Sequence, residues 1–140
     1  MQPLANFKTA LAARLELARI DSSISVSALD NLVGQLREGN TNTLATSSPN
    51  SLDDVFMDAC NTAEKKCSTE CDLTLVRSLR ALGPDMDWFK RPSKSESQFH
   101  KGHSNAEIIG RRVLDDRDGI TVGLTVLKPG VTYLDHHPPE

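Results

Sequence analysis

Aromatic residues are scarce in this sequence of 140 residues, where they make up only 4%. So few rings leave little material for the core of a domain built from β-strands alone. Basic residues are not in excess either, because 16 Lys and Arg stand against 19 Asp and Glu, for a net charge of -3. The basic surface typical of nucleic-acid-binding proteins is therefore absent, and we expect no nucleic-acid partner.

Long apolar runs are absent as well. The longest apolar stretches are far too short to span a bilayer, and no apolar signal-peptide segment follows Met1. With 38% hydrophobic and 25% charged residues, the composition is that of one ordinary globular domain rather than of a disordered chain. We therefore expect a cytoplasmic protein with no membrane partner.

Cysteine is also sparse, and the three cysteines form no metal-binding pattern. Cys60, Cys67 and Cys71 follow one another at steps of seven and four, so no CxxC pair occurs. Three is an odd number for disulfides, and we interpret these residues as small packing side chains in a reducing compartment. A reactive role stays open, because Lys65 and Lys66 can lower the pKa of a nearby thiol.

The first 85 residues show helical periodicity. Apolar side chains recur at steps of three and four, which is typical of helices with one buried face. The predicted helices cover residues 3–20, residues 27–39, a segment capped by Ser51, and residues 72–82. Ser27 and Asp30 form an approximate capping box for the second helix. Residues 39–51 are polar, include Pro49 and are interpreted as a linker.

After residue 85 the pattern changes to short apolar stretches separated by turn residues. Strands are predicted over residues 107–110, 120–127 and 131–134, with turns at 115–119 and at Pro129-Gly130. Residues 1–85 are thus a helical N-terminal region, residues 86–140 begin an antiparallel meander, and the fold class is α+β. Two or three strands leave bare edges and half a core, so we expect the natural domain to continue beyond Glu140.

Potential metal ligands crowd into the last eight residues, Tyr133-Leu134-Asp135-His136-His137-Pro138-Pro139-Glu140. Imidazole and carboxylate groups at such spacing suit a divalent transition ion, with zinc, iron, manganese, nickel and cobalt all open. His136, His137 and Glu140 are the candidate ligands, and the set is incomplete without later residues. The alternative is that two adjacent histidines are merely exposed polar residues. For His100 and His103 we expect a surface or hydrogen-bonding role.

The order of the residues in this tail resembles the first conserved motif of the cupin superfamily: Gly130, Tyr133, His136, His137 and Glu140. The five-residue gap between the glycine and the first histidine fits that motif. More specifically, the chain is similar to the bacterial cupin-type dimethylsulfoniopropionate lyases. In that family, segments like 102–110 (GHSNAEIIG) and 127–133 (LKPGVTY) precede the metal motif. The resemblance covers roughly residues 88–140, and over the first 85 residues it rests on helical character alone.

The resemblance implies a fold, a reaction and roles for particular residues. The fold would be a cupin barrel, or double-stranded β-helix, of which residues 86–140 are the incomplete start. The reaction would be the metal-dependent β-elimination of dimethylsulfoniopropionate, which gives dimethyl sulfide and acrylate and makes the protein a carbon–sulfur lyase. Tyr133 would be the catalytic base, and Trp88 and Tyr133 would contact the cationic substrate. His136, His137 and Glu140 would bind the metal.

One departure from the family pattern affects the metal ligands. In the family, two residues separate the tyrosine from the first histidine, and one residue separates the two histidines, of which the second precedes a proline. Here His136 and His137 are adjacent, so His136 has the expected distance from Tyr133 whereas His137 has the proline. If Glu140 matches the first of the two family glutamates, the ligand glutamate lies later. We therefore expect these 140 residues alone to be inactive.

Two other kinds of function stay open on the sequence alone. The first metal motif does not separate a lyase from cupins of another reaction type, such as sugar isomerases and dioxygenases. Alternatively, the helical region is an independent interaction or dimerisation module, and the tail is not catalytic. The apolar stripes of the helices must be buried somewhere, so we expect them either to cover the barrel or to form a homodimer.

Overall fold

Helices and strands succeed one another along this chain in the order that the periodicity predicts. The structure is a computed structural model, and it describes residues 2–21, 26–38, 43, 48–90 and 98–132. The helices are α1 (Gln2–Asp21), α2 (Val26–Arg37), α3 (Asp53–Lys66), α4 (Glu70–Leu82) and the short α5 (Gln98–Lys101), with a 3-10 turn at Gly83–Asp85. The strands are β1 (Trp88–Phe89), β2 (His103–Gly110), β3 (Asp115–Asp116) and β4 (Val122–Leu127). The α+β class is confirmed.

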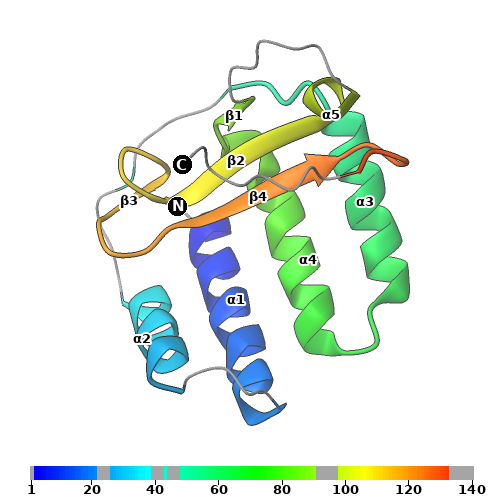
Figure 1. Ribbon diagram of the computed structural model, residues 1–140. Coiled ribbons are helices and arrows are strands. Elements are labelled where there is room, and N and C mark those ends of the chain that lie inside the picture. The colour runs from blue at the N-terminus through cyan, green and yellow to red at the C-terminus, as the bar shows by residue number, and fades with distance from the viewer. Residues whose placement is uncertain (1, 22–25, 39–42, 44–47, 91–97, 133–140) are drawn as a thin grey trace.

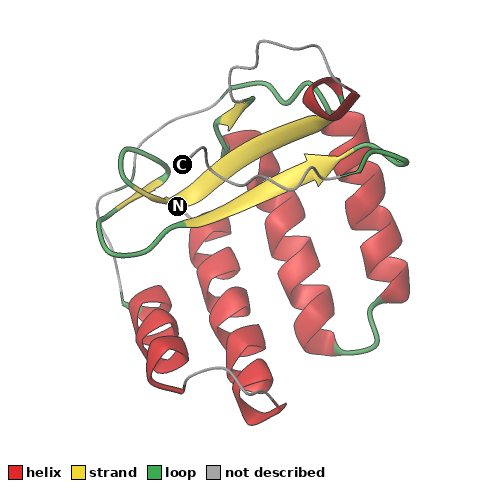
Figure 2. Ribbon diagram, viewed as in Figure 1, coloured by secondary structure: helices red, strands yellow, loops and turns green. Residues whose placement is uncertain are grey.

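The four long helices lie side by side on one side of the sheet (Figure 1). Helix α1 packs against both α2 and α4, and α4 also packs against α3. Figure 2 shows that α1, α3 and α4 run away from the sheet, so that one end of each lies near it. The buried side chains of α1 are accordingly concentrated in its first half, at Leu4, Phe7, Ala10 and Ala12.

One core joins the helices to the sheet. Helix residues Leu4, Val33 and Phe56 belong to the same buried cluster as strand residues Trp88 and Ile108. Within the predicted strand at residues 120–127, the alternate residues Val122, Leu124 and Val126 pack on this cluster. The apolar stripes of α1 and α2 are therefore largely buried within the chain, and their burial gives no separate reason for a homodimer. The homodimer itself stays a prediction.

Two predicted helix starts differ from those in the structure. Leu52, not Ser51, is the N-cap of α3, and its own amide N–H donates to Oδ1 of Asn50 at 2.9 Å. Leu52 is buried, so its packing sets where the helix begins. Ser27 is the second residue of α2, which begins at Val26, and Asp30 pairs with Arg19 of α1 at 2.5 Å.

The end of α4 is confirmed at Gly83-Pro84. Proline has no N–H and cannot continue the helical ladder, which turns here into a 3-10 turn. Gly83 is required for packing, because a Cβ at this position would lie 2.8 Å from Cε2 of Phe56. The carbonyl oxygen of Gly83 in turn accepts a hydrogen bond from the indole Nε1–H of Trp88 at 3.0 Å. This corner fixes β1 against α3 and α4.

The sheet is mixed rather than a purely antiparallel meander. Strand β2 is central and pairs antiparallel with β1 and β4, as expected for a meander. Strand β3 occupies the first two residues of the predicted turn at 115–119, and it pairs parallel with the end of β2. Val131 and Thr132 are not in a strand, and the remainder of the predicted strand at 131–134 lies outside the described residues. In the predicted linker, Thr43 and Ser48 form bridges to Asp115 and Asp87.

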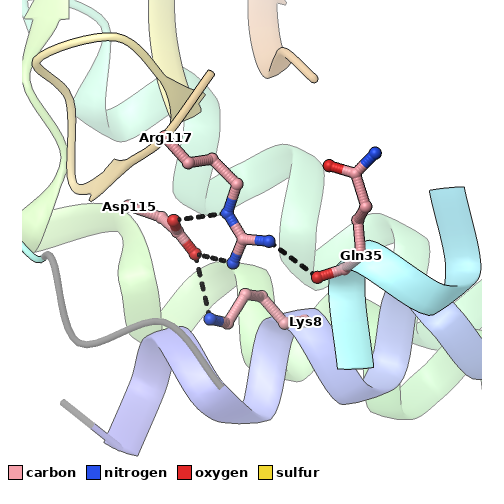
Figure 3. A network of polar contacts seen from close by, with 4 residues as sticks. All are labelled: Lys8, Gln35, Asp115 and Arg117. Carbon is pink, nitrogen blue, oxygen red and sulfur yellow. Dashed lines mark hydrogen bonds and ion pairs between the residues drawn. The ribbon is translucent and has the colours of Figure 1, made fainter. Parts of the chain in front are cut away.

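A buried ion cluster explains why β3 is not a solvent-exposed turn. Asp115 is completely buried, and its carboxylate accepts a hydrogen bond from Nζ of Lys8 at 2.9 Å (Figure 3). Arg117 donates to both oxygens of Asp115, from Nε at 2.8 Å and from Nη2 at 2.7 Å. Its Nη1 donates to the carbonyl oxygen of Gln35, near the C-terminal end of α2, at 2.7 Å. One carboxylate thus connects α1, α2 and the sheet.

We expect Asp115→Asn to lower the free energy of unfolding by about 3–5 kcal/mol, because it leaves two largely buried cations without their counter-charge. A urea titration followed by circular dichroism measures the change. Asp118→Asn is the matched control, since Asp118 pairs with Arg111 at 2.6 Å while both side chains are largely exposed. Asp118→Asn should unfold at the wild-type midpoint, and equal midpoints for the two variants would contradict the role given to Asp115.

Candidate functional site

The described chain leads into the predicted metal motif through a well-defined turn. Strand β4 ends at Leu127, opposite His103 of β2, and the amide of Lys128 donates to the carbonyl of Gly102 at 2.8 Å. The amide of Val131 then donates back to the carbonyl of Lys128 at 3.1 Å, with Gly130 at a φ of 82°. This left-handed conformation is favourable for glycine, so the predicted Pro129-Gly130 turn is confirmed.

The motif residues themselves, Tyr133, His136, His137 and Glu140, lie outside the described residues. Among the residues that the structure does describe, no group of three or more His, Cys, Asp or Glu side chains is arranged to hold a metal ion. The donor set of the motif, two imidazoles and a carboxylate, suits a divalent transition metal in its chemistry. The metal assignment therefore depends on the motif and stays a prediction.

Trp88, the other predicted substrate-binding residue, lies in the core. Its side chain is 6% exposed, and its ring meets that of Phe56 edge-on with centroids 5.2 Å apart. Because the indole N–H is also occupied by Gly83, both the ring and its donor have partners inside the protein. These contacts give Trp88 a packing role, and its assignment to substrate binding rests on the resemblance alone.

His103 is a hydrogen-bonding histidine, as expected, but a buried one. Its Nδ1 lies 2.7 Å from the carbonyl oxygen of Phe99, and its ring stacks on the Phe99 ring with centroids 4.5 Å apart. A carbonyl oxygen can only accept, so Nδ1 of His103 carries a proton in this contact. The contact anchors α5 to the first residue of β2, beside the turn that leads into the metal motif.

The sheet has two chemically different faces. Towards the helices it presents apolar side chains, among them Trp88, Ala106, Ile108, Leu124 and Val126. The alternate positions of the same strands point to the other side and carry Phe89, His103, Asn105, Glu107 and Thr125. The helices α1 to α4 do not cover this second face (Figure 2). His103 is buried under Phe99 of α5, and we call the other four residues, Phe89, Asn105, Glu107 and Thr125, the open face of the sheet.

The cysteines do not share one helix. Cys60 lies within α3, Cys67 is the C-cap of that helix, and Cys71 belongs to α4. Burial raises the pKa of the Cys60 thiol, an effect that the charge of Arg80 opposes and that of Glu64 reinforces. A raised thiol pKa lowers the fraction of reactive thiolate at neutral pH, which favours the packing role over a redox role.

We expect iodoacetamide at neutral pH to modify Cys60 much more slowly than Cys67 and Cys71 in the folded protein. Cys60 is 5% exposed and its pKa is raised, whereas the other two thiols are partly exposed. Peptide mass spectrometry after timed labelling gives the three rates, and labelling in urea provides the control in which all three should react alike. Rapid modification of Cys60 in the folded protein would overturn the packing interpretation.

The Asp115 cluster is the feature that sequence reasoning missed. Asp115, Asp116, Arg117 and Asp118 lie in the segment 115–119, which was predicted to be a turn. Within that run only Asp115 is fully buried, and its partner Lys8 is 107 residues away. The hydrogen bonds from Arg117 to Asp115 raise the pKa of the arginine further above neutrality, so its positive charge is permanent. No local pattern identifies such a pairing.

The comparison with known protein families identifies the class of protein to which this chain belongs. The family model for dimethylsulfoniopropionate lyases matches residues 40–140, so the chain belongs to the dimethylsulfoniopropionate lyase family. The match extends the resemblance from the strands back to α3 and α4, and only α1 and α2 precede it. No curated protein and no solved structure matches the chain. Among the described helices, none has the length and apolar character needed to cross a membrane.

Proposed function

We propose that this protein cleaves dimethylsulfoniopropionate to dimethyl sulfide and acrylate in a metal-dependent β-elimination. The observation that carries the proposal is the family match over residues 40–140, which includes the predicted metal motif. We further propose that the sheet of β1, β2 and β4 forms the first part of a cupin barrel. The central position of β2 and the turn at Gly130 are compatible with this arrangement.

The difficult step in this reaction is the removal of the α proton beside a carboxylate. The negative charge of that carboxylate opposes the formation of a carbanion, although the sulfonium on the β carbon is a good leaving group. A divalent metal, when bound, supplies positive charge that neutralises the substrate carboxylate. His136 or His137, together with Glu140, would hold it.

Tyr133 is the proposed base. As a phenolate it takes the α proton, the electron pair of the C–H bond forms the double bond of acrylate, and the β carbon–sulfur bond breaks. The sulfur retains the electrons of that bond, so neutral dimethyl sulfide leaves. Tyr133 lies three residues after Gly130 in the sequence, and the turn that contains Gly130 follows the end of β4.

The shared core bears on the alternative in which the helices are an independent interaction module. Leu4 and Phe7 of α1 and Leu36 of α2 are buried in the same cluster as Ile108 and Ile109 of β2. A separate module would instead bury these stripes in a core of its own or against a partner. The structure therefore favours a helical region that is integral to the enzyme, and no described feature favours an isomerase or a dioxygenase.

We expect Tyr133→Phe to reduce the rate of dimethyl sulfide release at least a hundredfold, the lower range for loss of a general base. The assay is headspace gas chromatography with the protein expressed from its whole gene, dimethylsulfoniopropionate as substrate and added divalent metal. Circular dichroism must show that the variant is folded. The proposal fails if the wild-type protein releases no dimethyl sulfide above the uncatalysed rate with any of the five metals, or if Tyr133→Phe has wild-type activity.

We expect the purified protein to contain a divalent transition metal, because the motif offers imidazole and carboxylate ligands. Elemental analysis of the wild type and of His136→Ala and His137→Ala gives the metal content, and the variant that loses more identifies the ligand. His100→Ala removes a histidine outside the motif and is the matched control. Wild-type metal content in the double variant that lacks both His136 and His137 would remove the motif from the metal site.

A further inference from the structure

Phe89 is an exposed aromatic residue on a polar surface. Its side chain is 37% exposed, and Leu17 of α1 is the one other large apolar side chain with comparable exposure in the described part of the chain. Phe89 alternates with the buried Trp88, so its ring lies on the open face of the sheet. Part of the phenyl ring is therefore accessible on this face, in a chain where aromatic residues make up only 4%.

The residues next to Phe89 are arranged in one row across three strands. Phe89 of β1 is directly opposite Asn105 of β2, and Asn105 is directly opposite Thr125 of β4. The hydroxyl of Thr125 donates to Oδ1 of Asn105 at 2.7 Å. This hydrogen bond uses the Oδ1 acceptor of the Asn105 side chain, so the two N–H donors on Nδ2 point away from Thr125. Residues directly opposite one another lie about 4.5–5.5 Å apart, within reach of one small ligand.

The open face has no positive charge in its strands. No lysine or arginine occurs in β1, β2 or β4, whereas Glu107 lies two positions after Asn105 on the same face. Among the described residues, the carboxylate of Glu107 forms no ion pair or hydrogen bond with a side chain. An aromatic ring and a carboxylate both attract a cation, and amide donors attract a carboxylate. A small zwitterion is complementary to this combination.

We propose that the open face binds the onium end of a zwitterionic substrate through Phe89, with Asn105 donating to one oxygen of the substrate carboxylate. The inference rests on the proposed function and deepens it, because it assigns residues that select the substrate. The ligand class is a carboxylate separated by two carbon atoms from a methylated sulfonium or ammonium group. Phe89 and Asn105 are specificity residues, and Thr125 is a positioning residue that holds the Asn105 amide.

The test uses 3-(trimethylammonio)propionate, which has the shape and charges of the substrate but a poor leaving group. Isothermal titration calorimetry with the protein expressed from its whole gene measures its binding without any reaction. We expect Phe89→Leu to weaken binding roughly five- to tenfold, as loss of a cation–aromatic contact does. Leu17→Ala, which removes the other exposed apolar side chain, is the matched control and should bind as the wild type does.

Two variants of Thr125 distinguish a positioning role of this residue from a merely structural role. Thr125→Val loses the hydroxyl that orients Asn105 and should weaken binding, whereas Thr125→Ser keeps the hydroxyl and should restore it. The KM for dimethylsulfoniopropionate should rise in Phe89→Leu by the same factor as the dissociation constant of the probe, with kcat within about twofold of wild type. Wild-type binding of the probe by both Phe89→Leu and Thr125→Val would overturn the inference.

The outcomes also distinguish this inference from the proposed function. If the wild type releases dimethyl sulfide and Phe89→Leu keeps the wild-type KM, the open face does not bind the substrate, and the proposed lyase activity still stands. If the wild type binds the probe through Phe89 but releases no dimethyl sulfide, the lyase assignment fails, and the binding site stands. Failure of the wild type to bind the probe at all overturns the inference.

Discussion

The fold depends on a single buried carboxylate. Asp115 has no exposed surface, and a carboxylate in such a place is tolerated only when it is paired and hydrogen-bonded. Its partners come from distant parts of the chain, because Lys8 belongs to α1, while Arg117 also holds a carbonyl of α2. The pairing therefore fixes where the first two helices lie relative to the sheet. It also holds β3 parallel to the end of β2, at a position where the sequence predicts a turn.

The ion pairing at Asp115 makes α1 and α2 part of the same folded domain as the sheet. The family match begins at residue 40, after α1 and α2, so these helices could be regarded as an addition to a smaller domain. The buried cluster contradicts that view, since it contains residues of both helices and of β2. The four long helices are gathered on one side of the sheet, and α1 to α4 leave its other face uncovered (Figure 2).

Much of this fold could be predicted from the sequence, because local periodicity carries it. The helical stripe of α1, the alternation in β4 and the turn at Gly130 are each set by neighbouring residues, and all three are confirmed. The predicted N-cap of α3 was wrong because a tertiary contact, the burial of Leu52, decides where that helix begins. Asp115 could not be found at all, since its pairing with Lys8 joins residues that no local rule connects.

Less of the candidate functional site than of the fold could be predicted from the sequence. The resemblance identified the family from residues 88–140, and the family match confirms it. The roles of Tyr133, His136, His137 and Glu140 stay predictions, since these residues lie outside the described part of the chain. Sequence reasoning assigned a substrate-contacting role to Trp88, which stays a prediction, and it did not distinguish the buried ring of Trp88 from the exposed ring of Phe89. Strand alternation separates the two residues, but the two-residue length of β1 leaves too little pattern to decide its faces without a structure.

Native-state hydrogen exchange tests the central claim, that α1, α2 and the sheet are one cooperative unit around Asp115. The account predicts that the slowest amides of α1 and α2 exchange with the same opening free energy as those of β2, near that of global unfolding. It would be contradicted if the amides of α1 and α2 exchanged through a separate opening of lower free energy while those of β2, α3 and α4 stayed protected.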